Sequence, residues 1–350
     1  MNTAESLANN TVTLDLPAAI ANIKRQGEPK RLFQFEHGLE DGIKEALCER
    51  FGLCVGLDKS SDDFTLNREI RLHQFIGTEF IRVFPGGIAW PGLAIKLGFA
   101  PPPIGPIQSW EDFEKYAWPR IEQVDFSVVE WFEGNLPDNM TLWAMTFLFQ
   151  QVSYLVGFEP LCVMLYDNRE LVKAITEKVG EFFLKYTEAV AQFSHVGAIC
   201  VGDDMGHKTG TLIKPDDLRE LFIPWQKQLI EMAHAYGKLG LFHTCGQVEA
   251  VMEDLIEQVG IDARHSTQDT IEPITVAKKR WGDRIGLLGG VDVDFITRRT
   301  PDQVRAYTRR IIETCAPGGG FALGVGNWVA DSVPLDNYLA MLDEGRRQGL

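Results

Sequence analysis

The feature that most constrains the fold of this chain is a short apolar run that ends at polar residues or glycine and then gives way to a segment with helical periodicity. The pattern occurs eight times along the 350 residues. Strands that alternate with helices pair in parallel, because a parallel neighbour needs a crossover connection. The runs predicted to be strands are residues 31–35, 80–84, 141–145, 198–202, 239–242, 262–264, 285–288 and 321–325.

Helix-like segments follow several of these runs, with apolar residues at helical spacing. They cover residues 167–195, 215–236, 248–259, 273–281 and 301–314. Two of them begin at start signals: Pro215 is followed by two acids, and Thr300 stands as an N-cap before a proline. A (β/α)8 barrel contains eight strand–helix units, the number found here. A doubly wound open sheet is the alternative, but its Gly-x-Gly-x-x-Gly fingerprint is missing after the first run.

We therefore predict an α/β protein with one (β/α)8 barrel over residues 31–350 and an N-terminal extension over residues 1–30. Residues 88–125, rich in proline and tryptophan, form an insert that is longer than a usual connection between strands. This insert either covers the mouth of the barrel as a lid or packs beside the barrel. Residues 139–158 carry no charge over about the length of a membrane span, but their polar residues favour a buried strand followed by a helix.

Charge and cysteine usage exclude several classes of function. The chain has 34 Lys and Arg against 49 Asp and Glu, a net charge of −15, which argues against binding to nucleic acid or to an anionic membrane. Its six cysteines lack the density and even spacing of a disulfide framework, so we expect reduced thiols. The first residues, MNTAESLANNTVTLDL, contain no apolar run of signal-peptide length. We expect a cytoplasmic protein.

Active sites of (β/α)8 barrels lie at the C-terminal ends of the strands, so the residues that follow the runs are the candidate site. The sharpest signal is His243-Thr244-Cys245-Gly246 after the fifth run. Alternate residues of a strand share a face, so His243 and Cys245 can converge on one point, and an imidazole with a thiolate suits zinc. A buried strand histidine beside an inert buried cysteine would also account for the pair.

Adjacent acids at the end of the fourth run point to opposite sides, so we expect Asp204 to face the site while Asp203 braces the loop. Arg82 lies within a strand and needs a partner, either a carboxylate such as Glu36 or an anionic group of the substrate. An exposed loop histidine is the simpler interpretation of His207. The candidate substrate-binding residues at the strand ends are Glu36, His37, Arg82, His207, His265, Asp292 and Asn327.

The C-terminal half also carries a set of motifs that resemble a known family. It reads VGDDMG, LFHTCGQVEAVMEDLIEQVGID, WGDRIGLLGGVDV, TPDQVRAYTRRIIE, GGGFALGVGN and VPLDNYLAMLDEGR. In order and spacing these motifs resemble the uroporphyrinogen decarboxylase superfamily, and within it the branch of corrinoid-dependent methyltransferases. The resemblance covers residues 161–346 closely and the N-terminal third only loosely. The fold that it implies is a (β/α)8 barrel.

The superfamily contains two chemistries, and the sequence favours one of them. True decarboxylases carry an Arg-rich N-terminal motif that pairs the carboxylates of the porphyrinogen, and this chain has no RQAGR-like segment. In the methyltransferase branch a His-x-Cys pair and a distant Cys bind zinc, which activates a substrate for methyl transfer to or from a corrinoid. His243 and Cys245 match the pair, whereas residues 321–327 lack the distant Cys. The third ligand stays open between Asp204, His207 and His265, or the site is metal-free and His243 donates a proton.

The resemblance therefore implies a methyltransferase that moves a methyl group from a small methylated substrate, including O-methyl aromatic compounds, to a corrinoid (cobalamin) on a partner protein. His243, Cys245 and Asp204 are the candidates that would stabilise the leaving group, with zinc as the implied metal. Two alternatives remain. One is a metal-independent decarboxylase or lyase of a small carboxylic acid held by Arg82, and the other is a non-catalytic relative that binds a ligand. The oligomeric state stays open, with a homodimer as one option.

Overall fold

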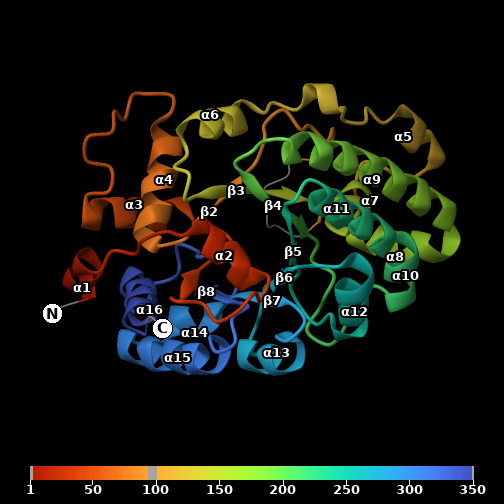
Figure 1. Ribbon diagram of the computed structural model, residues 1–350. Coiled ribbons are helices and arrows are strands. Elements are labelled where there is room, and N and C mark those ends of the chain that lie inside the picture. Colours follow the sequence, from red (N-terminus) through yellow and green to blue (C-terminus); the bar gives the residue numbers. More distant parts are fainter. Residues whose placement is uncertain (1–2, 94–100, 349–350) are drawn as a thin grey trace. The chain divides into compact units, whose positions relative to one another are not determined.

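The computed structural model describes residues 3–93 and 101–348, and it contains all eight predicted strands (Figure 1). They are β1 (Phe33–Gln34), β2 (Phe80–Val83), β3 (Thr141–Thr146), β4 (Val196–Gly202), β5 (Leu239–His243), β6 (Ala263–His265), β7 (Gly286–Val291) and β8 (Phe321–Val325). The strand order in the sheet is β1-β8-β7-β6-β5-β4-β3-β2. The pairs β1–β8, β4–β5, β6–β7 and β7–β8 run parallel. The predicted (β/α)8 fold class is confirmed.

Helices connect the strands, as the periodicity predicted. They are α1 (Thr3–Asn9), α2 (Leu16–Ile23), α3 (Asp41–Phe51), α4 (Phe64–Ile76), α5 (Trp110–Lys115), α6 (Ser127–Asn135), α7 (Phe149–Val156), α8 (Phe158–Asp167), α9 (Arg169–Ala191), α10 (Pro215–Leu221), α11 (Ile223–Ala235), α12 (Glu249–Glu253), α13 (Ile274–Trp281), α14 (Val293–Arg298), α15 (Pro301–Cys315) and α16 (Leu335–Arg347). Two shorter elements are the 3-10 helix η1 (Ile121–Gln123) and the π-helical segment η2 (Asp254–Val259).

Several predicted boundaries are wrong. The helix predicted over residues 215–236 is divided into α10 and α11, because Pro224 stands in the first turn of α11 and lacks the N–H that a continuous helix needs. The second half of the segment 248–259 is the π-helical η2. Strand β7 does not end at Leu288 but continues through Gly289 and Gly290, whose φ values of 87° and 114° suit only glycine.

The chain divides into two compact units that alternate along the sequence. Unit 1 comprises the described residues of Met1–Arg82, Gly134–Trp143 and Asp262–Leu350, and unit 2 comprises those of Val83–Glu133 and Ala144–Ile261. The domain boundaries expected from the sequence stay a prediction. Of the insert predicted over residues 88–125, residues 94–100 lie outside the described residues.

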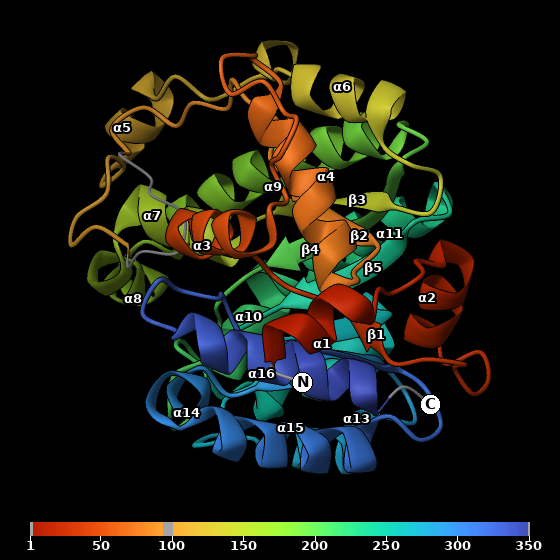
Figure 2. The same cartoon turned by 90° about the vertical axis from the view of Figure 1, so that its left-hand side faces the viewer.

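Unit 1 contains α1 and α2 from the N-terminal region together with the C-terminal helices. Helices α15 and α16 lie side by side, and α1 packs against α16 (Figures 1 and 2). The side-chain amide of Asn22 in α2 donates a 2.8 Å hydrogen bond to the Phe321 carbonyl, which ties this helix to β8. Helix α15 begins at the predicted cap, where the Gln303 N–H donates to Oγ1 of Thr300.

Unit 2 is organised by β4, β5 and the helices that follow them. The two strands pair from Ala198 opposite Leu239 to Gly202 opposite His243, and α9 and α11 lie side by side (Figure 1). Because both strands end at the same level, the residues that follow β4 come next to those that follow β5. The register of this pair therefore places the candidate site.

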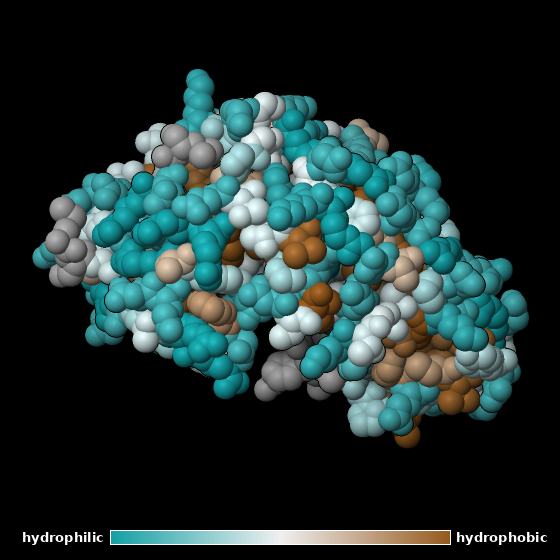
Figure 3. Space-filling model, turned by 90° about the horizontal axis from the view of Figure 1, so that it is seen from below, coloured by the Kyte–Doolittle hydropathy of each residue, from teal (hydrophilic) through white to brown (hydrophobic). Residues whose placement is uncertain are grey.

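The uncharged segment of residues 139–158 forms β3 and α7, as predicted. Among the described residues, no helix has the length and apolarity that a membrane crossing requires. On the face drawn in Figure 3, hydrophilic residues cover most of the surface and hydrophobic residues gather towards its lower right. The large exposed apolar side chains include Val163 and Tyr166 of α8. All six cysteines are free thiols.

Candidate functional site

The turns after β4 and β5 of unit 2 pack tightly against each other. The Gly206 N–H donates a 3.2 Å hydrogen bond to the Cys245 carbonyl. Two glycines permit this approach, because a Cβ at Gly206 would lie 2.6 Å from the Cys245 oxygen, and Gly246 has a φ of 77°. The glycines in DDMG and HTCG thereby bring Asp204 next to Cys245.

Asp204, His243 and Cys245 each offer one potential ligand atom, and the three atoms lie within 4.8 Å of one another. Nε2 of His243 is 3.7 Å from Oδ1 of Asp204 and 3.6 Å from Sγ of Cys245. The same Asp204 oxygen accepts a 2.9 Å hydrogen bond from the Cys245 N–H, which orients the carboxylate. The His243 side chain is buried, whereas that of Asp204 is 41% exposed. Asp204 and Cys245 are both half-buried, so a ligand can reach the cluster from their side.

This donor set suits zinc. Zinc takes nitrogen, sulfur and oxygen ligands tetrahedrally at about 2.0–2.3 Å, which places ligand atoms about 3.3–3.8 Å apart, and both separations from Nε2 of His243 fall in that range. Three protein ligands would leave one coordination position open, as in catalytic zinc sites. The methyltransferase branch that the sequence resembles has a distant Cys ligand, and β8 contains no cysteine in its place. Cys315 is buried in α15 of unit 1, where burial raises the pKa of its thiol to about 12.

Asp203 points away from this cluster. Its side chain is fully buried, and Oδ1 accepts hydrogen bonds of 2.8 and 3.1 Å from the N–H groups of Leu148 and Gln150 at the start of α7. Oδ2 accepts a 2.8 Å hydrogen bond from the side-chain amide of Gln226. Burial raises the pKa of Asp203 although these hydrogen bonds oppose the shift. Asp203 anchors α7, while its neighbour Asp204 joins the cluster.

His207 lies in the turn after β4 but outside the cluster of Asp204, His243 and Cys245. His207 is exposed, and its backbone N–H donates a 2.7 Å hydrogen bond to the Gly210 carbonyl within the same turn. The structure thus places His207 as a surface residue of this loop.

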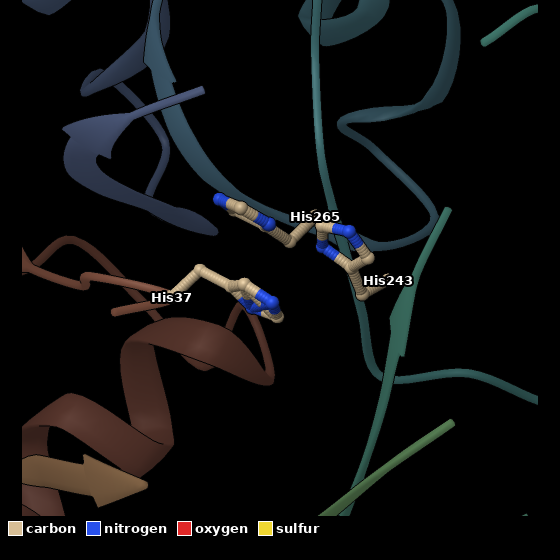
Figure 4. Close-up of side chains that lie close together, drawn as sticks. All are labelled: His37, His243 and His265. Carbon is tan, nitrogen blue, oxygen red and sulfur yellow. The ribbon is translucent and has the colours of Figure 1, made fainter. Parts of the chain in front are cut away.

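In unit 1 the structure brings three other predicted site residues together. The rings of His37 and His265 stack with centroids 5.1 Å apart and an angle of 18° between their planes (Figure 4). Nε2 of His37 is 3.4 Å from Nη1 of Arg82. The Arg82 guanidinium lies 4.0 Å from the centroid of Trp328 and 5.7 Å from that of Trp143. Trp328, which directly follows the strand-end residue Asn327, is not among the predicted site residues.

Glu36, another predicted site residue of unit 1, is buried beneath the end of β1. Its carboxyl oxygens accept hydrogen bonds of 3.2 Å each from the Val325 N–H and the Tyr338 hydroxyl. Burial raises the pKa of Glu36 from 4.5 to about 8, and the two hydrogen bonds oppose that shift. Glu36 therefore connects β1 to β8 and α16, and its burial favours the protonated form of the carboxyl group.

Asp292 and Asn327 line a hollow of about 620 Å³ in unit 1. Oδ1 of Asp292 accepts a 2.9 Å hydrogen bond from the Phe295 N–H and so caps α14. Oδ1 of Asn327 accepts a 2.8 Å hydrogen bond from the Trp328 N–H. Both side chains fix the backbone around the hollow.

The eight strands in one sheet, the alternating helices and the polar residues at the strand ends define a (β/α)8 protein. A sequence profile of the family Uroporphyrinogen decarboxylase (URO-D) matches residues 96–348. The chain belongs to this family, which confirms the superfamily resemblance of its C-terminal motifs.

Two known proteins illustrate the relationship. Over 198 residues the chain is 25% identical to the uroporphyrinogen decarboxylase of Thioalkalivibrio sulfidiphilus (strain HL-EbGR7). This match covers 53% of the chain and 52% of the relative, so it spans about half the length of that protein. A solved structure of a methyltransferase from Methanosarcina mazei aligns over 95% of this chain and 98% of its own, with a TM-score of 0.71 and 17% identity. The second comparison shows a shared fold.

Proposed function

We propose that this chain is a methyltransferase that passes a methyl group from a small methylated compound, such as an O-methyl aromatic compound, to a corrinoid carried by a partner protein. The observation that carries the proposal is the cluster of Asp204, His243 and Cys245, whose donor atoms and spacing suit a catalytic zinc. Membership of the URO-D family and the fold shared with the Methanosarcina mazei methyltransferase support it.

The chemical problem in such a transfer is the leaving group. The bond between the methyl carbon and oxygen breaks with its electron pair on oxygen, and an alkoxide or phenoxide leaves poorly unless its charge is stabilised. Zinc, when bound, would supply a Lewis acid for that oxygen. The new bond to the methyl carbon uses the electron pair of a Co(I) corrinoid on the partner protein, so the step needs no further oxidant or reductant.

The three side chains have separable tasks in this scheme. Burial fixes the His243 ring, and the hydrogen bond from the Cys245 N–H fixes the carboxylate of Asp204, so little rearrangement accompanies binding. The half-buried Asp204 would adjoin substrate in this scheme. If the cluster works without a metal, His243 is its candidate to protonate the leaving oxygen.

The first experiment measures the metal content of protein purified without chelator. We expect about one zinc per wild-type chain and none in the His243→Ala/Cys245→Ala variant, with reduced zinc in Asp204→Asn. A matched control, His234→Ala/Cys54→Ala, removes one imidazole and one thiol outside the cluster and should keep its zinc. No zinc in the wild type, or zinc retained in His243→Ala/Cys245→Ala, would contradict the metal site.

The second experiment tests the transfer itself. Wild-type protein with a methoxyarene and cob(I)alamin should show the loss of Co(I) absorbance as methylcobalamin forms, and the His243→Ala/Cys245→Ala variant should lose this activity. Tight ligand binding without any turnover would instead favour a non-catalytic relative.

A second candidate function is a metal-independent decarboxylase or lyase of a small carboxylic acid. It is favoured by Arg82, whose guanidinium lies against Trp328 at 4.0 Å, where a carboxylate could pair with it. Turnover of a carboxylic acid that is lost in Arg82→Ala and kept in His243→Ala/Cys245→Ala would support this function over methyl transfer.

A further inference from the structure

A hollow of about 470 Å³ lies in unit 2 beside the cluster of Asp204, His243 and Cys245. Its walls include Pro101, Pro103, Phe149, Phe158 and Leu212, with Asp204 contributing a polar edge. A cavity of about 150 Å³ already holds benzene, so this hollow has room for a substituted aromatic ring. Because Asp204 belongs both to the hollow and to the cluster, a group bound here lies against the proposed metal ligand.

The proline wall of the hollow is fixed to α7 by the backbone that follows it. The N–H groups of Gly105 and Ile107 donate hydrogen bonds of 2.9 and 3.0 Å to the carbonyls of Val156 and Leu155. A Cβ at Gly105 would lie 2.3 Å from the Leu155 oxygen, so only glycine permits this approach. This part of the predicted insert is therefore bonded to α7, the helix that supplies Phe149 to the lining of the hollow.

The part of the lining that α7 supplies is fixed as well. Phe149 stands in the first turn of α7, whose N-terminal N–H groups donate to the buried carboxylate of Asp203. The two adjacent acids after β4 thus serve one site: Asp203 positions the helix that carries the aromatic wall, and Asp204 connects the hollow to His243 and Cys245. A wall held in this way forms a pocket before the ligand arrives, which lowers the cost of binding.

The charges around the hollow decide which ligands it accepts. Its described lining residues include two acids, Asp204 and Glu159, and no Lys, Arg or His. With zinc bound, the Cys245 thiolate and the Asp204 carboxylate would balance the charge of the ion, and Glu159 would remain as net negative charge. Glu159 is exposed, so water screens its repulsion of a ligand carboxylate. Such a carboxylate also loses hydration against proline and phenylalanine side chains, whereas an uncharged apolar ring packs against them.

We propose that this hollow between residues 101–103, α7 and α8 binds the methyl donor of the proposed transfer, and that it selects an uncharged aromatic methyl ether over an anionic one. The identity of the ligand as methyl donor rests on the proposed function, whereas the binding preference does not. The geometry of the pocket and the charge of its lining carry the proposal.

The test is a direct binding measurement by calorimetry on the full chain purified without chelator, with no corrinoid present. The probes are methoxybenzene and 4-methoxybenzoate, which share the ether and the ring and differ in charge. We expect wild-type protein to bind methoxybenzene about tenfold more tightly, and Glu159→Gln to narrow that difference. Equal or tighter binding of 4-methoxybenzoate by the wild type would overturn the proposal.

A second variant tests the location of the pocket. Leu212→Trp fills the hollow and should weaken methoxybenzene binding about tenfold or more, whereas Val163→Trp, which adds the same ring at an exposed position of α8, should not. Unchanged binding in Leu212→Trp would overturn the location. Binding as expected without methyl transfer would refute the proposed function alone, and methyl transfer unaffected by Leu212→Trp would refute the pocket alone.

Discussion

Replacing the buried Glu36 by glutamine should remove a pH-dependent loss of stability. Glu36 is 2% exposed, and burial raises the pKa of its carboxyl group from 4.5 to about 8. Below pH 4.5 both the folded and the unfolded states hold the proton, so the group has no effect there. Between pH 4.5 and pH 8 the unfolded chain loses the proton while the folded chain retains it. Stability therefore falls as the pH rises through this window and levels off above it.

The magnitude follows from the two pKa values. Each pH unit within the window costs about 1.4 kcal/mol of unfolding free energy, so the loss is on the order of 3 kcal/mol at pH 7 and 5 kcal/mol at pH 8. Glutamine resembles the protonated acid in shape, and its carbonyl oxygen can accept from the Val325 N–H or the Tyr338 hydroxyl. Glu36→Gln should therefore match the wild type at pH 5 and exceed it by several kcal/mol at pH 8.

Urea unfolding followed by circular dichroism, repeated from pH 5 to pH 8, measures this difference. Other carboxyl groups with raised pKa values, such as Asp203 and Glu79, are common to both proteins and cancel in the comparison. Glu130→Gln, at an exposed position of α6, is the matched control and should track the wild type at every pH. Parallel curves for Glu36→Gln and the wild type would show that Glu36 is not a buried, protonated acid.

Three further outcomes are expected. Gly246→Ala should lower the free energy of unfolding by on the order of 2–4 kcal/mol in thermal unfolding, because its φ is 77° and the new Cβ would lie 2.3 Å from Gly206. Gly210→Ala is the control, because its Cβ would meet open space, and equal losses of stability in the two variants would contradict this reasoning. Asp203→Ala should lower the free energy of unfolding by about 2–3 kcal/mol without loss of zinc, because the Asp203 side chain anchors α7 and is not a proposed ligand. A loss of zinc as large as in Asp204→Asn would refute these separate roles of the two acids. Zinc affinity should fall as the pH is lowered, because protons compete with zinc for the ligand atoms, and a flat profile would argue against a His and Cys site.

Local features of the sequence predicted most of the fold. Each strand is a short apolar run that stops at glycine or a polar residue, and that pattern depends only on neighbouring residues. The cap of α15 at Thr300 and the pairing of His243 with Cys245 are local in the same sense, since two residues apart in a strand share a face. These features could therefore be predicted before any tertiary contact was known.

The remaining features depend on segments that are distant in the sequence. Asp204 joins His243 and Cys245 only because β4 and β5 pair in one register and two glycines allow their following turns to touch. Glu36 is buried by Val325 and Tyr338, which come from the other end of the chain.

Neighbouring residues are enough to specify the strand–helix alternation and the convergence of His243 and Cys245, because backbone geometry and side-chain periodicity act over a few residues. Tertiary structure alone decided the third member of the cluster, the protonation of Glu36 and the hollow beside Asp204. Each of these depends on which distant groups share a space and how far water is excluded from it, and no short stretch of sequence specifies that.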